Sequence, residues 1–165
     1  MTDFLEHLQR GPLLCDGAMG TQLHAHGITF DHSLDELNLT QPEVVLNVHR
    51  GYVEAGADLL ETNTFGGNRF RLLEHDLEDK VAAINRAGAR LARKAADESR
   101  RTIYVAGSVG PLGVHLAPLG RVSPAEAFSA FREQITVLSE AGVDALIIET
   151  FSDLVEIEQA IRAAR

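Results

Sequence analysis

One stretch of the sequence occurs twice in related form, and this internal repeat constrains the fold more than any other feature. Residues 55–65, AGADLLETNTF, align without gaps with residues 141–151, AGVDALIIETF. Both copies carry a glycine suited to ending a helix, an aspartate that enters an apolar run, and a Thr-Phe pair that closes it. Self-similarity of this kind is typical of an architecture built from repeated units. The repeat therefore predicts two equivalent periods of strand and helix.

Four short apolar runs have the composition of buried strands. They cover residues 13–16, 58–62, 103–106 and 144–150. Each run is bounded by glycine or polar residues, which is the pattern of strands covered on both faces in a parallel sheet.

Amphipathic helices are predicted between and after these strands. They cover residues 42–55, 77–95, 124–141 and the segment from 153 onward. Ser123 and Glu126 form a capping box before the third helix, and Gly56 and Gly142 end the first and third. Alternating strands and helices predict a parallel sheet with right-handed crossovers, either an open doubly wound sheet or part of a barrel. Because the last helix has no stop signal, we favour an α/β fold that forms the amino-terminal half of a (β/α)8 TIM barrel, about four βα units.

The composition limits the class of protein. The chain has 165 residues, 45% of them hydrophobic, and a net charge of -9, which fits one domain, residues 1–165, that binds neither nucleic acid nor an anionic membrane surface. No apolar run approaches the ~18 residues of a membrane span, and the first residues lack the pattern of a signal peptide. We therefore expect a cytoplasmic protein with a small-molecule partner. Cys15 is the only cysteine, so the chain cannot build a multi-cysteine metal site.

Two carboxylates follow different predicted strands. Asp16 ends the first strand and Glu149 ends the fourth, and the carboxyl ends of parallel strands meet in one mouth. Such a pair can hold a cationic group such as an ammonium, or it can perform acid and base chemistry. A turn-stabilising role for Asp16 before Gly17 also stays open. Cys15 is expected to alternate away from Asp16 into a small apolar role.

Four ordered motifs together resemble one known family. LLCDGAMGTQL, EAGADLLETNTFGGN, VAGSVGPLG and AGVDALIIETFSDLVE are similar to segments of the homocysteine S-methyltransferase family, from about residue 11 to the last residue. The resemblance implies a (β/α)8 barrel that binds homocysteine and a zinc ion at its carboxyl-terminal mouth. It also implies zinc-dependent methyl transfer to the thiol of homocysteine, giving methionine.

The resemblance assigns residues as well. It implies that Asp16 and Glu149 hold the ammonium of homocysteine, and it places further residues at the mouth. The expected substrate-binding residues are Asp16, Gly17, Asn63, Thr64, Phe65, Gly107, Ser108 and Glu149. The family's zinc is held by three cysteines of later strands, so we expect neither metal ligands nor catalytic residues here, and the chain is expected to be inactive alone.

The remaining expectations concern partners and rival functions. A half-barrel exposes sheet edges, so we expect it to pair with the missing carboxyl-terminal half or to self-associate. The methyl donor stays open, with methyltetrahydrofolate as a candidate. Two other classes of function remain: a metal-free aldolase or isomerase that uses Asp16 and Glu149, and a non-catalytic amino-acid-binding module.

Overall fold

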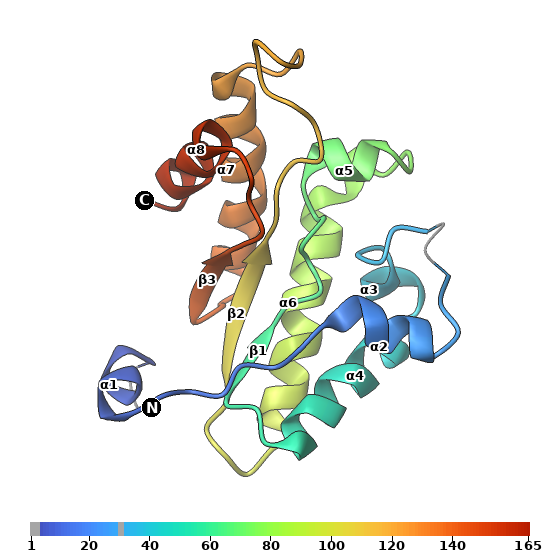
Figure 1. Ribbon diagram of the computed structural model, residues 1–165. Helices are drawn as coiled ribbons and strands as arrows, with labels where there is room; N and C mark the ends of the chain where they lie inside the picture. The colour runs from blue at the N-terminus through green and yellow to red at the C-terminus, as the bar shows by residue number, and fades with distance from the viewer. Residues whose placement is uncertain (1–3, 30–31) are drawn as a thin grey trace.

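A three-stranded parallel sheet lies at the centre of the structure, a computed structural model that describes residues 4–29 and 32–165. The strands are β1 (Leu59–Glu61), β2 (Tyr104–Val109) and β3 (Ala145–Ile148), in the order β1-β2-β3 (Figure 1). Leu60 of β1 lies beside Val105, and Gly107 of β2 lies beside Leu146. Parallel pairing between strands that alternate with helices confirms the predicted fold class.

The first predicted strand, residues 13–16, pairs with β1 at a single bridge between Cys15 and Leu59. Leu59 donates its N–H to the Leu14 carbonyl, and Asp16 donates its N–H to the Leu59 carbonyl. The next rung is different, because Glu61 donates its N–H to Oδ2 of the Asp16 side chain rather than to a backbone oxygen. The segment joins the parallel sheet as predicted, but its ladder is shorter than a regular strand's because a side chain replaces the backbone acceptor.

Four long helices correspond to the predicted ones. They are α4 (Pro42–Ala55), α6 (Val81–Asp97), α7 (Pro124–Glu140) and α8 (Leu154–Ala164). The capping box of Ser123 and Glu126 is present at α7, and Asp153 caps α8 by accepting the N–H groups of Val155 and Glu156. Helix α6 begins at Val81 rather than at residue 77, because a 3-10 turn, η1 (Glu78–Lys80), precedes it.

Four short helices had no predicted counterpart: α1 (Phe4–Arg10), α2 (Met19–Ala25), α3 (Leu37–Thr40) and α5 (Arg69–Leu73). They are too short for a helical period to stand out in the sequence. Helix α1 is positioned by contact, since the rings of Phe4 and His7 pack edge-on against Tyr104 at 5.1 and 5.7 Å between centroids. Helix α5 is capped by Asn68, whose side chain accepts the N–H groups of Phe70 and Arg71.

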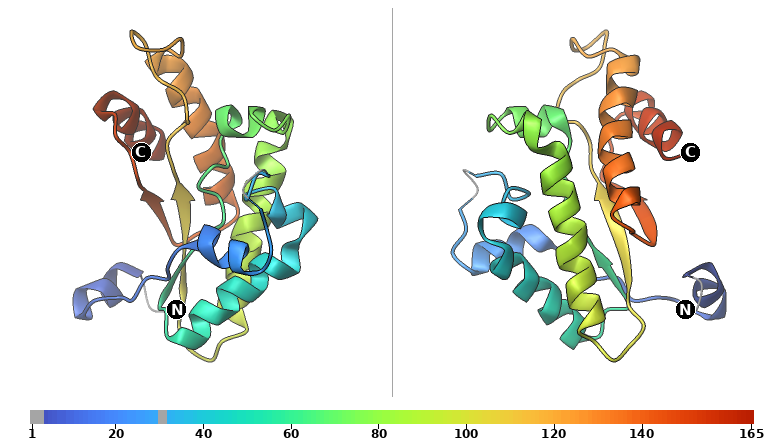
Figure 2. Two further views of the ribbon diagram at one scale, coloured as in Figure 1. Left: turned by 45° about the vertical axis from the view of Figure 1, so that its right-hand side comes forward. Right: turned by 180° about the vertical axis from the view of Figure 1, so that it is seen from behind.

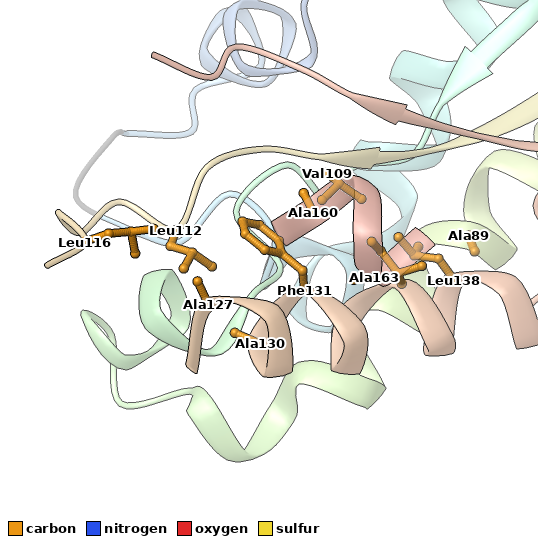
Figure 3. Close-up of a cluster of buried hydrophobic side chains, with 11 residues drawn as sticks. Ala89, Val109, Leu112, Leu116, Ala127, Ala130, Phe131, Leu138, Ala160 and Ala163 are labelled. Atoms are coloured by element: carbon orange, nitrogen blue, oxygen red, sulfur yellow. The ribbon is translucent and has the colours of Figure 1, made fainter. Parts of the chain in front are cut away.

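The helices α6 and α7 cover one face of the sheet, as the view from behind in Figure 2 shows. Figure 3 shows Phe131 of α7 in a cluster of buried apolar residues that includes Leu112, Val109 of β2 and Ala160 of α8. A second cluster joins α4 and α6 to the start of β1 and β2. The residues of β3 stay only partly buried, and Leu154 of α8 is 85% exposed. Among the described residues, no helix is both long and apolar enough to cross a membrane.

The sequence repeat is also a structural repeat. The aspartates that enter β1 and β3 form matching pairs of hydrogen bonds with the neighbouring strand. Asp58 donates its N–H to the Leu14 carbonyl and accepts the Leu14 N–H at Oδ2, and Asp144 does the same with Val105. Each carboxylate also accepts from an arginine, Arg101 at 3.1 Å or Arg93 at 2.6 Å. The repeated aspartates therefore set the register of both outer strand pairs.

Candidate functional site

A pocket of about 490 Å³ lies where the strands end. It brings together residues that follow the first bridge, residues at and after the end of β1, Ser108 of β2, and Glu149 just after β3. The described lining residues include Asp16, Gly17, Asp35, Glu61, Asn63, Phe65, Ser108 and Glu149. Asp16 and Glu149 share this pocket, as the order of the strands led us to expect.

Asp16 lies at the rim of the sheet with its carboxylate fixed by the backbone of β1. The N–H of Glu61 donates to Oδ2 over 3.0 Å. Burial raises the pKa of Asp16 to about 6, against the hydrogen bond from Glu61, which lowers it, and the charge of Glu149 raises it further. The carboxylate is thus oriented for a ligand while its charge is incompletely compensated.

Glu61 and Asp35 are pocket-lining carboxyl residues that the sequence analysis did not single out. Glu61 is the last residue of β1 and lines the same pocket as Glu149. Burial, followed by the neighbouring carboxyl group of Glu149, raises the pKa of Glu61 to about 7. One sequence signal could have found it: Glu61 is a carboxylate inside an apolar run, where the aligned repeat has Ile147.

The other two carboxyl groups also have protein donors. The Ser108 hydroxyl of β2 donates to Oε1 of Glu149 at 2.7 Å. The Asp35 carboxylate, only 8% exposed, accepts the Gly66 N–H at 3.0 Å, and burial raises its pKa to about 6. None of the described residues that line the pocket is a lysine, arginine or histidine. A concave site with carboxyl groups and no cation favours a positively charged ligand.

Buried polar side chains fix the loop after β1 through hydrogen bonds. Asn63 donates to the Leu34 carbonyl and to Oδ1 of Asn38, while Gln134 of α7 donates to the Thr64 carbonyl. Thr64 is fully buried, and its hydroxyl donates to the Ser108 carbonyl. These bonds leave Asn63 at the pocket and direct Thr64 into the interior.

The expected substrate-binding residues therefore divide into two groups. Those that line the pocket are Asp16, Gly17, Asn63, Phe65, Ser108 and Glu149. Thr64 and Gly107 are not among the lining residues. Gly107 instead lies against the helix layer, where a Cβ would come within 3.0 Å of Leu146 and 3.1 Å of Leu138. These two support the loop and the strand rather than the pocket surface.

Cys15 differs from its expected apolar role. Its half-buried thiol lies 3.3 Å from Oε1 of Glu61 and 3.5 Å from Oδ1 of Asp16. The expectation that it alternates away from Asp16 was wrong, because a single bridge does not impose the alternation of a regular strand. Burial and the hydrogen bond to Glu61 raise the pKa of the thiol to about 12.

The side chains around Cys15 do not match the zinc site that the resemblance implies. Cys15, Asp16 and Glu61 are close enough to contact one ion, but the chain has a single cysteine, and its thiol acts as a hydrogen-bond donor to the carboxylates. Zinc binds the deprotonated thiolate. This cluster does not fit a zinc site of three cysteines.

Residues 13–165 match the family model described as homocysteine S-methyltransferase. The methionine synthase of Mycobacterium tuberculosis is 39% identical over 173 residues, which cover 99% of this chain and 14% of that protein. The methionine synthase of Mycobacterium leprae is also 39% identical over 173 residues.

Solved structures agree with the family model. The metallated form of the homocysteine methyltransferase MmuM from Escherichia coli superposes with a TM-score of 0.81 at 30% identity, covering 96% of this chain and 60% of that one. Its oxidized form gives a TM-score of 0.78 at 31% identity. The chain thus spans about three fifths of these solved relatives and a small part of the methionine synthases. The family match across nearly the whole sequence, supported by the fold, shows that this chain belongs to the homocysteine S-methyltransferase family of enzymes.

Proposed function

We propose that this chain provides the amine-binding part of a site for methyl transfer to the thiol of homocysteine, giving methionine. The observation that carries the proposal is the pocket in which Asp16 and Glu149 meet with no cationic side chain among the described lining residues. An ammonium group has three donors, and each carboxylate can accept one in a charge-assisted hydrogen bond. Membership in the homocysteine S-methyltransferase family favours homocysteine as the ligand over the substrate of an aldolase or isomerase.

The roles of the individual residues follow from their contacts. Asp16 is oriented by the Glu61 N–H and Glu149 by the Ser108 hydroxyl, so both carboxylates are preorganised before a ligand arrives. Preorganised acceptors bind more tightly because less ordering entropy is lost on binding. Asn63 and Phe65 form the wall supplied by the loop after β1.

The rest of the proposed site requires groups outside the described residues. A thiol is a weak nucleophile at neutral pH, and zinc makes it reactive by favouring the thiolate. We propose that the zinc ligands lie outside this chain, as does the site for the methyl donor, with methyltetrahydrofolate as a candidate.

The open edge of the sheet at β3 bears on the architecture of the whole protein. We propose that residues 1–165 form the first part of a (β/α)8 barrel and that another strand pairs with β3. The partly buried residues of β3 and the exposed Leu154 of α8 support this, since strands inside such barrels are covered on both faces. Self-association through this edge is the alternative, and the molecular mass in solution distinguishes the two.

The experiment is a calorimetric titration of the protein, as its gene encodes it, with L-homocysteine. Losing one hydrogen bond to a charged group costs about 1.5–3 kcal/mol, so Asp16→Asn and Glu149→Gln should each weaken binding tenfold or more. Glu158→Gln, on the exposed side of α8, is the matched control and should leave affinity unchanged. A thiol acid without the amine that binds as tightly as homocysteine would contradict the proposal. Binding without methyl transfer would favour the amino-acid-binding module.

A further inference from the structure

We propose that Asn63 presents its side-chain oxygen to the pocket as a third acceptor for the ammonium group of the ligand, and that Asn38 is the positioning residue that fixes this orientation. The inference rests on the proposed amine-binding function. It adds an uncharged acceptor to Asp16 and Glu149, which line the same pocket as Asn63. An ammonium group has three N–H donors, so two carboxylates and one amide oxygen give each donor an acceptor.

The orientation of the Asn63 amide is set by two oxygen acceptors. Its Nδ2 donates to the Leu34 carbonyl at 2.8 Å and to Oδ1 of Asn38 at 3.1 Å. A flipped amide would place Oδ1 against these two oxygens and lose both hydrogen bonds, because an amide oxygen cannot donate. The amide nitrogen of Asn63 therefore faces the protein.

The Asn38 amide is fixed in the same way. This residue of α3 is 3% exposed, and its Nδ2 donates to the Asn63 carbonyl at 2.7 Å and to the Ile84 carbonyl at 3.2 Å. Both partners are acceptors only, so a flip of Asn38 would lose both bonds, and its Oδ1 is left to accept from Asn63. Backbone carbonyls thus determine the direction of both side-chain amides.

The Asn63 oxygen is the atom of this arrangement that stays available. Among the described residues no hydrogen bond ends at Oδ1 of Asn63, and this atom is not one of the fully buried polar atoms that lack a partner. Asn63 itself lines the pocket. Its oxygen is therefore open to a ligand that donates hydrogen bonds, whereas the opposite orientation would have offered N–H groups to a ligand carboxylate.

A close helix contact holds Asn38 in place. A Cβ at Gly88 of α6 would lie 2.7 Å from Nδ2 of Asn38 and 2.7 Å from Cγ2 of Thr64. Glycine weakens the interior of a helix relative to alanine, so its presence here serves the approach of these two side chains. The Asn38 amide is thus held between α6 and the loop that follows β1.

The first measurement tests the positioning in the ligand-free protein. Hydrogen exchange of the side-chain amides, followed by NMR, should be slow for both N–H groups of Asn63, because each has a protein acceptor. The exposed Asn47 of α4 is the reference for fast exchange. Asn38→Leu, which keeps the branched shape, and Gly88→Ala should each accelerate exchange at Asn63. Exchange in the wild type as fast at Asn63 as at Asn47 overturns the fixed orientation.

The second measurement tests the acceptor. Binding of L-homocysteine should move the NMR resonance of the Asn63 side-chain carbonyl carbon downfield, as expected for an oxygen that gains a hydrogen bond, and leave that of Asn85 unchanged. Loss of this bond in Asn38→Leu should weaken binding about tenfold in a calorimetric titration. An unchanged Asn63 resonance on saturation with homocysteine overturns the acceptor role, and this readout needs no variant.

Asn85→Leu is the matched control for general support of the loop. Asn85 is also fully buried and its Nδ2 donates to the Gly67 carbonyl at 2.7 Å, but among the described residues it has no hydrogen bond with Asn63. This variant should lose stability as Asn38→Leu does, yet weaken homocysteine binding much less. Equal losses of affinity in the two variants overturn the positioning role. Failure of the wild type to bind homocysteine overturns the proposed function and the acceptor role together, while slow exchange at Asn63 would still establish the fixed amide.

Discussion

Glu61 donates its backbone N–H to Oδ2 of Asp16 over 3.0 Å, so the residue that ends β1 also orients a carboxylate of the pocket. The bond takes the position of the next backbone rung between the first segment and β1. Strand pairing and site geometry therefore depend on the same contact. A change at Asp16 should therefore affect both the strand pairing and the geometry of the pocket. Suitable substitutions can separate these two effects.

We expect Asp16→Asn and Asp16→Ala to have different effects. Asparagine retains an oxygen that can accept the Glu61 N–H, so it should weaken ammonium binding while preserving the free energy of unfolding. Alanine removes the acceptor of a partly buried donor, which costs about 1–3 kcal/mol in addition to the loss of binding. Calorimetry and urea unfolding measure the two effects. Equal unfolding free energies for both variants would show that the Glu61 N–H does not depend on Asp16.

The pH dependence of stability should carry the signature of Glu61. Its folded-state pKa, about 7, lies above the ordinary glutamate value of 4.5, so the folded state binds the proton more tightly than the unfolded state. This contribution to stability is complete below about pH 4.5 and is lost as the pH rises to about 7. Relative to the wild type, Glu61→Gln should therefore gain stability between pH 5 and 8. Urea unfolding at these two pH values tests this, and a constant difference between the proteins would contradict it.

His49 should oppose this trend. It is fully buried in α4, neither ring nitrogen has a hydrogen-bond partner, and burial lowers its pKa to about 4. A depressed histidine pKa means that stability is lost as the pH falls from about 6.5 to about 4, by at most about 1.4 kcal/mol per pH unit.

His49→Leu, of similar volume, should raise the free energy of unfolding by about 1 kcal/mol at neutral pH, or roughly 2–4 °C in Tm. The gain should grow on acidification. The exposed His75→Leu is the control and should change little. A destabilised His49→Leu protein would indicate that the imidazole is needed for packing.

The repeated aspartates should contribute unequally to stability. Asp144 and Arg93 are 18% and 31% exposed and 2.6 Å apart, whereas Asp58 and Arg101 are 31% and 42% exposed and 3.1 Å apart. Solvent weakens exposed ion pairs more than buried ones. Asp144→Ala should therefore lower the free energy of unfolding by about 1.5–3 kcal/mol, and Asp58→Ala by less. Thermal unfolding of both variants provides the comparison, and the reverse order would contradict this account.

Local sequence determined much of the fold. The boundaries of α4, the capping box at Ser123 and Glu126, and a helix from residue 153 onward were all predicted, because these signals act between residues within one helical turn. The repeat predicted the shared role of Asp58 and Asp144 at strand entries. Parallel strand order then sufficed to bring Asp16 and Glu149 into one pocket.

Tertiary structure alone decided the polar details of that pocket. Nothing local in the sequence shows that Glu61 lines the same pocket as Glu149, that Cys15 faces two carboxylates, or that Thr64 is buried. These contacts join segments distant along the chain, and they depend on a side chain replacing a backbone rung and on buried donors beneath the loop. Periodicity and caps are properties of neighbouring residues, whereas the protonation state of a buried carboxyl depends on every group that the fold brings around it.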